Sequence, residues 1–516
     1  MALSSPCRIP RSTWSRRLRC RRFPLPPLVT GVAQPGRSGR ALGILKRLAL
    51  AAGWVGLLPS SVAALCEAQL GPAMETLATA PELRSARLGI LLATEAGRDI
   101  YARDADQFFV PASNTKLFTT AAALDRLGPD FRFRTTVYGS GQPGLQPLVV
   151  VGGGDPSFSH DDLQALGDQL HVAGISQVSR LIGDDSYFPG SAYNPNWEWE
   201  DVQADYGAPV NSLILNGNAF EVVLSPGAAG EPLGVSWAEP TWAPTWAIEN
   251  HGRTGARGSD SNTQVFRSWG RPALVVQGQL AADHGVDRWE IANPQPADYF
   301  VEQLAHTLEQ SGIAVGSTTA ASDRPPTEGL RALATVESAP LSELLVPTNQ
   351  DSDNLYAEAL LKGLGMATDP DALDATDAGI GAIVASVASL GVPAASFELV
   401  DGSGIARQNL ATPRALVSVL QVMAHHPQRQ VFLDSLAVAG VSGTLRNRLG
   451  GTVLAGNLRG KTGALTGNVS LTAYLMPPQS EALVVSILIN HANVHASQLR
   501  RLIDQMLLQI AQLQGC

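Results

Sequence analysis

The sequence predicts a mixed α/β (α+β) fold in which one domain is interrupted by a large, mostly β insertion. Helical and strand patterns share the first and last parts of the chain, as expected if both belong to one domain. Between about residues 138 and 325 the pattern changes to short strands that Gly and Pro interrupt, with many Trp residues. A helical pattern returns from about residue 340. With 516 residues, 45% of them hydrophobic, the chain is long enough for more than one packed domain.

Apolar periodicity places individual elements at both ends of the chain. Near the beginning it predicts the following: helices over residues 66–79 and 113–127, strands over Leu88–Thr94 and Ile100–Phe109, and a helix end at Gly128. Near the end it predicts buried strands over Asn468–Leu475 and Ala482–Asn490. The last helix carries an apolar face made by Leu499, Leu502, Ile503, Met506, Leu507, Ile510 and Leu513.

These patterns divide the chain into segments. We expect a signal peptide and basic leader over residues 1–64, the first part of the split domain over 65–137, the insertion over 138–325, and the second part over 326–516.

The first segment has the features of a secretory signal. Residues 1–64 hold eleven Arg or Lys residues and no Asp or Glu. Lys46 and Arg47 precede the apolar run Leu48–Leu58, and Val62-Ala63-Ala64 suits signal peptidase. The run is too short to span a bilayer as a helix. We therefore expect a periplasmic protein with no integral membrane span after cleavage; the alternative is an N-terminal core helix.

Charge and composition exclude several classes of function. The formal net charge is −9 although residues 1–64 are basic, so the rest of the chain would repel nucleic acid. No H-E-x-x-H motif or Gly-rich phosphate site is present, so we expect neither a metal nor a cofactor. Cys66 and Cys516 either pair and join the chain ends or remain free thiols. The sequence leaves the oligomeric state open.

Lysine is scarce in this chain, so each position is informative. Only four of the 37 basic residues are Lys. In Ser113-Asn114-Thr115-Lys116, the first and last side chains share one helical face. A neutral Lys can accept the proton of a Ser hydroxyl and Arg cannot, so Ser113 and Lys116 are candidates for nucleophile and base. A helix-capping Ser beside a solvated Lys is the alternative. Lys362 follows Glu358 by four residues, which predicts a plain helical ion pair.

Two further motifs lie later in the chain. In Ser352-Asp353-Asn354, Ser352 can relay a proton and Asn354 can hold an amide; a capping cluster is the alternative. Lys461-Thr462-Gly463-Ala464 leads into a predicted strand, whose edge can pair with an extended peptide. Lys461 and Thr462 can bind a carboxylate, and Gly463 allows the backbone of that peptide to come close. An ordinary turn before a strand is the alternative.

The three motifs, in this order, resemble those of the penicillin-binding protein and β-lactamase superfamily. The long segment between Ser113 and Ser352 is similar to that of the D-alanyl-D-alanine carboxypeptidases/endopeptidases of the penicillin-binding protein 4 type, peptidase family S13. The resemblance covers nearly all of residues 66–512 and includes two further segments: Tyr206-Gly207-Ala208-Pro209 with Leu213-Ile214-Leu215-Asn216, and Asp401-Gly402-Ser403-Gly404-Ile405-Ala406-Arg407.

The resemblance implies a transpeptidase-like domain, an antiparallel sheet flanked by helices. It also implies a serine-type D-Ala-D-Ala carboxypeptidase or DD-endopeptidase that acts on peptidoglycan stem peptides and is inhibited by β-lactams. Ser113 would form the acyl-enzyme, Lys116 would be the base, and Ser352 with Lys461 would pass the proton to the leaving amine. The backbone N–H groups of Ser113 and Ala464 would form the oxyanion hole.

The family's side-chain pocket maps to Asp201, Tyr206 and Arg407, which would suit a zwitterionic end of a diaminopimelate residue. Ala464 stands where many relatives have Thr or Ser, which puts one carboxylate hydrogen bond in doubt. Two alternatives remain: a β-lactamase or esterase on the same scaffold, which would turn over nitrocefin quickly, and a non-catalytic β-lactam-binding or cell-wall-binding module.

Overall fold

The structure is a computed structural model that describes residues 65–516 except 143, 269, 477–480 and 514–516. The predicted signal peptide and leader lie outside the described residues. Within the described ranges, none of the helices has the length and apolar character that crossing a membrane requires.

An antiparallel sheet combines strands from the beginning and the end of the described chain. Its strand order is β19-β20-β21-β22-β1-β2. The strands are β1 (Arg87–Thr94), β2 (Asp99–Arg103), β19 (Ala437–Val438), β20 (Leu458–Leu465), β21 (Asn468–Leu475) and β22 (Leu483–Asn490). β1 and β22 pair along their whole length, with Ile90 opposite Ile487. The first and last parts of the described chain therefore contribute strands to the same sheet.

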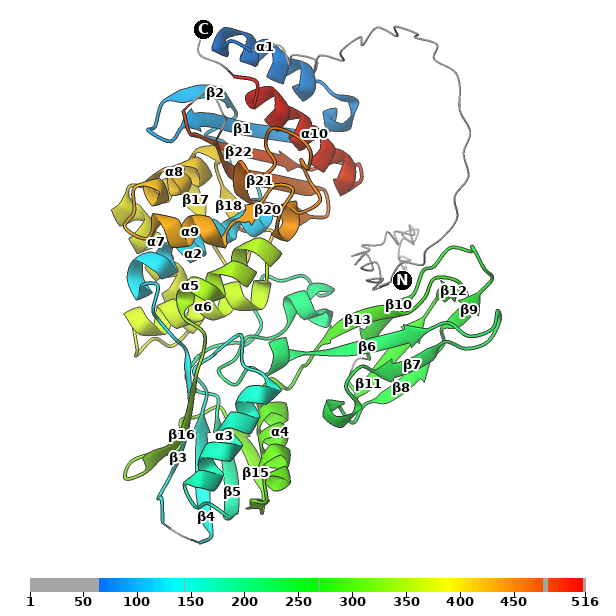
Figure 1. Ribbon diagram of the computed structural model, residues 1–516, viewed down its shortest axis with the longest axis vertical. Coiled ribbons are helices and arrows are strands. Elements are labelled where there is room, and N and C mark those ends of the chain that lie inside the picture. Colours follow the sequence, from blue (N-terminus) through cyan, green and yellow to red (C-terminus); the bar gives the residue numbers. More distant parts are fainter. Residues whose placement is uncertain (1–64, 143, 269, 477–480, 514–516) are drawn as a thin grey trace, which may run out of the picture. The chain divides into compact units, whose positions relative to one another are not determined.

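Both faces of this sheet are covered (Figure 1). Helices α1 (Glu67–Ala78) and α10 (Ala496–Ile510) pack together on one face. Ile90 of β1 belongs to the core on that face, and its neighbour Leu91 belongs to the core on the other. Every residue of β21 and β22 is buried, because side chains alternate between two covered faces. This double burial explains the continuous apolar runs in the sequence.

The second face packs against a helical layer. Its helices are α2 (Lys116–Leu127), α5 (Leu341–Val346), α6 (Asn354–Thr368), α7 (Ala375–Leu390), α8 (Pro413–Ala424) and α9 (Arg429–Ser435). α8 contacts β1 and β22 directly, and α2 contacts α6, α7 and α8. A short two-stranded sheet pairs β17 (Phe397–Glu398) with β18 (Leu410–Ala411).

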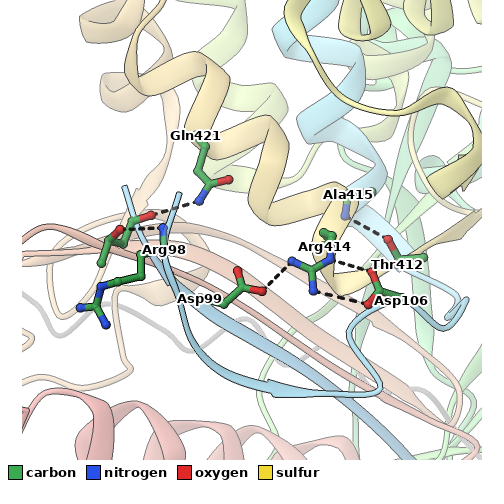
Figure 2. Close-up of polar contacts among 8 residues, drawn as sticks. Arg98, Asp99, Asp106, Thr412, Arg414, Ala415 and Gln421 are labelled. Carbon is green, nitrogen blue, oxygen red and sulfur yellow. Dashed lines mark hydrogen bonds and ion pairs between the residues drawn. The ribbon is translucent and has the colours of Figure 1, made fainter. Parts of the chain in front are cut away.

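Arg414, in the first turn of α8, ties this helix to the β1–β2 region (Figure 2). Its guanidinium bonds to Asp99 and Asp106 at 2.8 and 2.6 Å. Further along α8, Gln421 donates to the carbonyl oxygen of Thr94 at 3.0 Å. The side chain of Arg414 is partly exposed, so each ion pair adds only about 1 kcal/mol or less. Their main effect is to fix the chain between β2 and the residues that carry Ser113.

A second sheet lies in the middle of the chain, with strand order β14-β5-β4-β3-β16. Its strands are β3 (Arg134–Gly139), β4 (Gln146–Val151), β5 (Gln177–Asp184), β14 (Ala314–Val315) and β16 (Arg331–Glu337), and β15 (Thr318–Ala321) also pairs with β5. Helices α3 (His160–Val172) and α4 (Pro296–Gln310) share an apolar core with it. β16 returns from the middle segment and pairs with β3.

Further short strands lie in the middle segment. They are β6 (Ala219–Ser225), β7 (Gly234–Trp237), β8 (Ala247–Asn250), β9 (Arg253–Gly255), β10 (Gln264–Arg267), β11 (Ala273–Gln277), β12 (Gln279–Ala281) and β13 (Asp287–Ala292). They form sheets of order β13-β6-β7, β10-β11-β8 and β12-β9 around a small core of their own. The short, Gly- and Pro-interrupted strands predicted from the sequence in this region correspond to these strands. The division of the chain into domains stays a prediction.

Two predicted elements differ from those observed. The strand predicted over Ile100–Phe109 ends at Arg103, because Asp104 has a φ of 45° and turns the chain away. The helix predicted over 113–127 becomes α-helical only at Lys116. A 3-10 turn over Ala112–Thr115 (η2) precedes it, and Ala112 has a φ of 50°. Single-residue turns of this kind leave no periodic signal in a sequence.

The two ends of the described chain meet beside α1 and α10. The N–H of Leu65 donates to the carbonyl oxygen of Gln512 at 2.8 Å, and Leu65 forms a parallel bridge with Leu513. Cys66 is disulfide-bonded. Cys516 lies outside the described residues, so its pairing with Cys66 stays a prediction.

The apolar face of α10 should account for much of its contribution to stability. Ile503 is fully buried against the sheet, whereas Gln505 on the same helix is exposed. We expect Ile503→Ala to lower the free energy of unfolding by about 2–5 kcal/mol, because it leaves a cavity. Gln505→Ala should change it by less than about 0.5 kcal/mol. Urea unfolding of both variants measures this, and equal effects would contradict the packing described.

Candidate active site

Ser113 lies in the turn η2, immediately before α2, and two strands of the first sheet hold this turn in place. The hydroxyl of Ser470 on β21 donates to the carbonyl oxygen of Pro111 at 2.7 Å. A Cβ added to Gly463 on β20 would lie 2.7 Å from the same oxygen. Any side chain at Gly463 would therefore push the turn away from β20. The glycine is therefore needed for close approach of this turn, while its predicted role beside a substrate backbone stays a prediction.

Lys116 is fully buried, and its Nζ contacts three segments of the chain. It lies 3.1 Å from Ser113 Oγ, one turn earlier. It also donates to Asn354 Oδ1 at 2.6 Å and to the carbonyl oxygen of Ser403 at 2.8 Å. The predicted contact between Ser113 and Lys116 is thus present, and two distant segments fix the amine within it.

Ser352 and Lys461 form a second hydroxyl–amine pair. Lys461 Nζ donates to Ser352 Oγ at 2.8 Å and to the carbonyl oxygen of Thr462 at 2.9 Å. Lys461 is also fully buried. Ser352 has a φ of 67°, because it ends the π-helical turn η7 (Pro347–Asp351) just before α6. This left-handed residue aims its hydroxyl at β20.

Asn354 connects Lys116 with the middle segment. It is the first residue of α6, and Asp353 caps that helix by accepting from the N–H of Tyr356. While Asn354 Oδ1 accepts from Lys116, its Nδ2 donates to the carbonyl oxygen of Tyr206 at 2.9 Å. Both polar ends of the amide are used, so the side chain has one defined orientation.

Burial controls the charge of the two amines. Burial lowers the pKa of Lys116 to about 8, against the nearby carboxyl groups of Asp401, Asp353 and Glu358, which favour the charged form. Burial also lowers the pKa of Lys461 well below its usual value, and the charge of Lys116 lowers it further. A neutral amine is therefore accessible at this site near neutral pH, which is what a base for a hydroxyl proton requires.

The outer edge of β20 is open beside this cluster. β19 pairs with β20 only through Gly460 and Arg459 within the described residues. Thr462 follows, and its hydroxyl contacts that of Thr444 at 2.8 Å. Ala464 is exposed. An extended peptide can pair with this edge, which belongs to the strand that contacts the turn carrying Ser113.

The residues predicted for a side-chain pocket come together, with one addition. Tyr206 donates to Asp201 Oδ1 at 3.1 Å. Arg407 makes its ion pair with Glu198, at 2.6 Å, and not with Asp201. The N–H of Glu198 donates to Asp201 Oδ2 at 3.2 Å, which links the two halves. Burial raises the pKa of Asp201, so a cationic partner would favour its charged form. Glu198 was missed, although its position three residues before Asp201 on a short turn was a usable signal.

Arg407 also contacts the turn that follows β20. Its Nη1 donates to the carbonyl oxygen of Thr466 at 3.3 Å. The guanidinium therefore lies between Glu198 and the end of β20.

The predicted plain ion pair of Glu358 and Lys362 is wrong. Both side chains are buried, with exposed fractions of 2% and 3%. Lys362 Nζ donates to the carbonyl oxygens of Ser191 and Val210. Glu358 Oε1 accepts instead from the N–H groups of Gly402 and Ser403. The spacing of four residues correctly placed both residues on one helix. Contacts with other segments decide which groups the two side chains bind.

Comparison with known proteins is consistent with this geometry. The model of the D-Ala-D-Ala carboxypeptidase 3 (S13) family matches residues 70–512. A D-alanyl-D-alanine carboxypeptidase from Actinomadura sp. strain R39 is 34% identical over 80% of this chain and 79% of its own. A penicillin-sensitive carboxypeptidase A from Dictyostelium discoideum is 27% identical over 80% and 83%.

The fold has a close counterpart among solved structures. Penicillin-binding protein 4 from Haemophilus influenzae superposes with a TM-score of 0.76 at 22% identity, over 84% of this chain and 98% of that protein. The predicted fold class, a mixed α/β transpeptidase-like domain, is thereby confirmed.

The buried amine of Lys116 should make stability depend on pH. Its pKa is about 8 when folded and about 10.4 when unfolded. Between these values the unfolded chain binds more protons, so the wild type becomes more stable as pH rises. Below the pKa of the folded state the amine is charged, and the full cost of burying that charge then lowers the free energy of unfolding. Lys116→Met removes this titration. From about pH 7 to pH 10.5, its stability relative to wild type should fall by about 2–3 kcal/mol.

Denaturant unfolding across that pH range tests this expectation. Thr119→Val is the matched control, because Thr119 is a buried polar residue of the same helix without an ionisable group. Its difference from wild type should stay constant. A constant difference for Lys116→Met as well would contradict the lowered pKa.

Proposed function

The chain belongs to the D-Ala-D-Ala carboxypeptidase 3 (S13) family, and we propose that Ser113 is the nucleophile of its serine-type hydrolase reaction. One observation carries the assignment: Ser113 Oγ lies 3.1 Å from the Nζ of a fully buried Lys116. A Lys whose pKa is lowered to about 8 is neutral in roughly a tenth of the molecules at pH 7, and this neutral form can take the hydroxyl proton.

In the acylation step, Ser113 Oγ attacks the carbonyl carbon of the peptide bond that precedes a terminal D-alanine. Lys116 Nζ accepts the hydroxyl proton, and the bond from carbon to oxygen forms. The tetrahedral intermediate then collapses and the carbon–nitrogen bond breaks. The proton that Lys116 took is relayed to the leaving amine through Ser352 Oγ, which accepts a hydrogen bond from Lys461 Nζ at 2.8 Å, and Lys116 is neutral again.

Water then attacks the resulting ester. One proton of the water returns to Ser113 Oγ by way of Lys116, and the shortened peptide leaves as a carboxylate. A cross-linked stem peptide in which a D-alanine carbonyl is joined to another side chain presents the same bond. Carboxypeptidase and endopeptidase reactions therefore use the same steps.

Backbone N–H groups would stabilise the negative oxygen of the intermediate. Ser113 lies in the first turn of a helical segment, where N–H groups lack helical partners. The N–H of Ala464 would supply the second donor, from the open part of β20. Thr462 and Gly463 line the same edge, where the substrate backbone would pair, and Asn354 would hold its penultimate amide.

We assign Asp201, Tyr206 and Arg407, with Glu198, to the substrate side chain. The cluster offers two carboxylates and one guanidinium within a short distance. A zwitterionic end, such as that of diaminopimelate, carries the complementary ammonium and carboxylate.

Inhibition and location follow from the same assignment. β-Lactams would acylate Ser113, as the name of the penicillin-sensitive relative indicates for that protein. Because stem peptides lie outside the cytoplasm, the enzyme would act there, in the periplasm, after removal of the predicted signal peptide.

The decisive experiment uses a diaminopimelate pentapeptide, a cross-linked muropeptide dimer and a fluorescent penicillin. Wild type should release D-alanine or split the dimer, and Ser113→Ala should do neither and take no label. Lys116→Arg should fold but acylate at least about 1000-fold more slowly, because Arg stays charged. Normal labelling of Lys116→Arg would disprove its role as base.

The same assays separate the alternative functions. Rapid nitrocefin turnover without D-alanine release would favour a β-lactamase. Stable labelling at Ser113 with neither peptide reaction would favour a non-catalytic binding module.

The side-chain pocket has its own test. Arg407→Ala should lower kcat/KM by roughly tenfold or more for a pentapeptide with a free diaminopimelate carboxylate, because a charge-assisted hydrogen bond is lost. The loss should shrink when that carboxylate is amidated. Arg126→Ala, at the exposed end of α2, is the control and should behave as wild type. Equal losses on both peptides would contradict the assignment.

A further inference from the structure

The segment Asp401–Gly404 is packed between α2 and α6 and contacts the catalytic turn directly. The carbonyl oxygen of Ser403 accepts from Lys116 Nζ at 2.8 Å. A Cβ added to Gly404 would lie only 2.0 Å from the carbonyl oxygen of Ala112, so this segment touches the residue before Ser113. A shift of the segment would move an acceptor of the base.

Two consecutive peptide groups of this segment are held at both ends. In the first, the carbonyl oxygen of Gly402 accepts from Thr119 Oγ1 at 2.7 Å. Its N–H, on Ser403, donates to Glu358 Oε1 at 2.8 Å. In the second, the carbonyl oxygen of Ser403 meets Lys116, and its N–H, on Gly404, donates to Asp401 Oδ1 at 2.7 Å.

Of the four side chains that bond to these two peptide groups, Glu358 is the one that belongs to α6. Its Oε1 accepts from the N–H of Gly402 as well, at 2.9 Å. Asn354 lies one helical turn earlier, and its Oδ1 accepts from Lys116 at 2.6 Å. One face of α6 therefore holds Lys116 twice: directly through Asn354, and indirectly through Glu358 and the backbone.

We propose that Glu358 is a positioning residue for the base. By fixing the N–H groups of Gly402 and Ser403, it holds the carbonyl oxygen of Ser403 on Lys116 Nζ, and so keeps that amine against Ser113 Oγ. The proposal rests on the proposed role of Lys116. It explains why a carboxyl group is kept at a helix position that is 2% exposed, where an apolar side chain would cost less desolvation.

The charge of the surroundings gives a specific readout. Lys116 faces the carboxyl groups of Asp353, Glu358 and Asp401, and the amine of Lys461. Glu358 itself faces Asp401 and Lys362, and burial raises the pKa of Glu358 to about 8, so its carboxylate forms over the pH range in which Lys116 titrates. Once ionised, that carboxylate favours the ammonium form of Lys116, so its removal should lower the pH at which acylation becomes half-maximal. A loss of stability alone would not move that midpoint.

The test measures the second-order rate of Ser113 acylation by a fluorescent penicillin from about pH 6 to 10, together with thermal unfolding. Glu358→Leu removes both hydrogen bonds, and we expect its plateau rate to fall roughly 100-fold, as for a misplaced catalytic group. Glu358→Gln keeps one acceptor oxygen and should lose about tenfold or less. In both variants the midpoint should shift to lower pH.

Lys362→Met is the matched control. Lys362 lies on the same helix, is equally buried, and donates to Ser191 and Val210 instead of the 401–404 segment. It should lose stability but keep its plateau rate within about twofold of wild type.

Each result decides between the explanations. A folded Glu358→Leu with the wild-type rate and midpoint would overturn the proposal, as would an equal rate loss in Lys362→Met. If Glu358→Leu does not fold, the midpoint of Glu358→Gln decides. Wild-type protein that takes no label at Ser113 would refute the proposed function, which is a different failure.

Discussion

The site depends on one constraint: a primary amine must be buried without being left unpaired. Lys116 is fully buried and satisfies its Nζ through Ser113, Asn354 and the backbone of Ser403. An unpaired ammonium there would cost far more than a folded protein can spare. These contacts come from segments that only the folded chain brings together. Lys116 can therefore act as a base only when the chain has folded so that these segments meet.

The second amine makes this constraint more severe and more useful. Two ammonium groups in one desolvated site repel each other, and the pKa of Lys461 is lowered by both burial and the charge of Lys116. The two amines therefore do not both carry a charge readily, and at least one of them is more easily neutral than a Lys in water. Arg could replace neither residue, because it cannot lose its proton in this pH range. This explains why the chain, which otherwise uses Arg almost exclusively, retains Lys at these two positions.

The sequence predicted those features that are encoded within a few neighbouring residues. The buried strands β21 and β22, the helix α10 and the three motifs were all visible, because each is defined within a few residues. The partners of charged groups were not. Arg407 binds Glu198, and Lys362 binds two carbonyl groups, since both choices depend on how distant segments pack. The turn at Ala112 was also missed, because a single positive φ has no periodic signature.

Asn354 shows how substrate recognition and catalysis are connected in this arrangement. Its Oδ1 accepts from Lys116, while its Nδ2 donates to the backbone of Tyr206 beside the proposed side-chain pocket. The Nδ2 group has a second N–H and Oδ1 has a second lone pair, so the amide can bind a substrate while it keeps both of these contacts. A substrate bound to Asn354 would then contact the same side chain that accepts from Lys116, so the position of the base and the binding of substrate are linked through one residue.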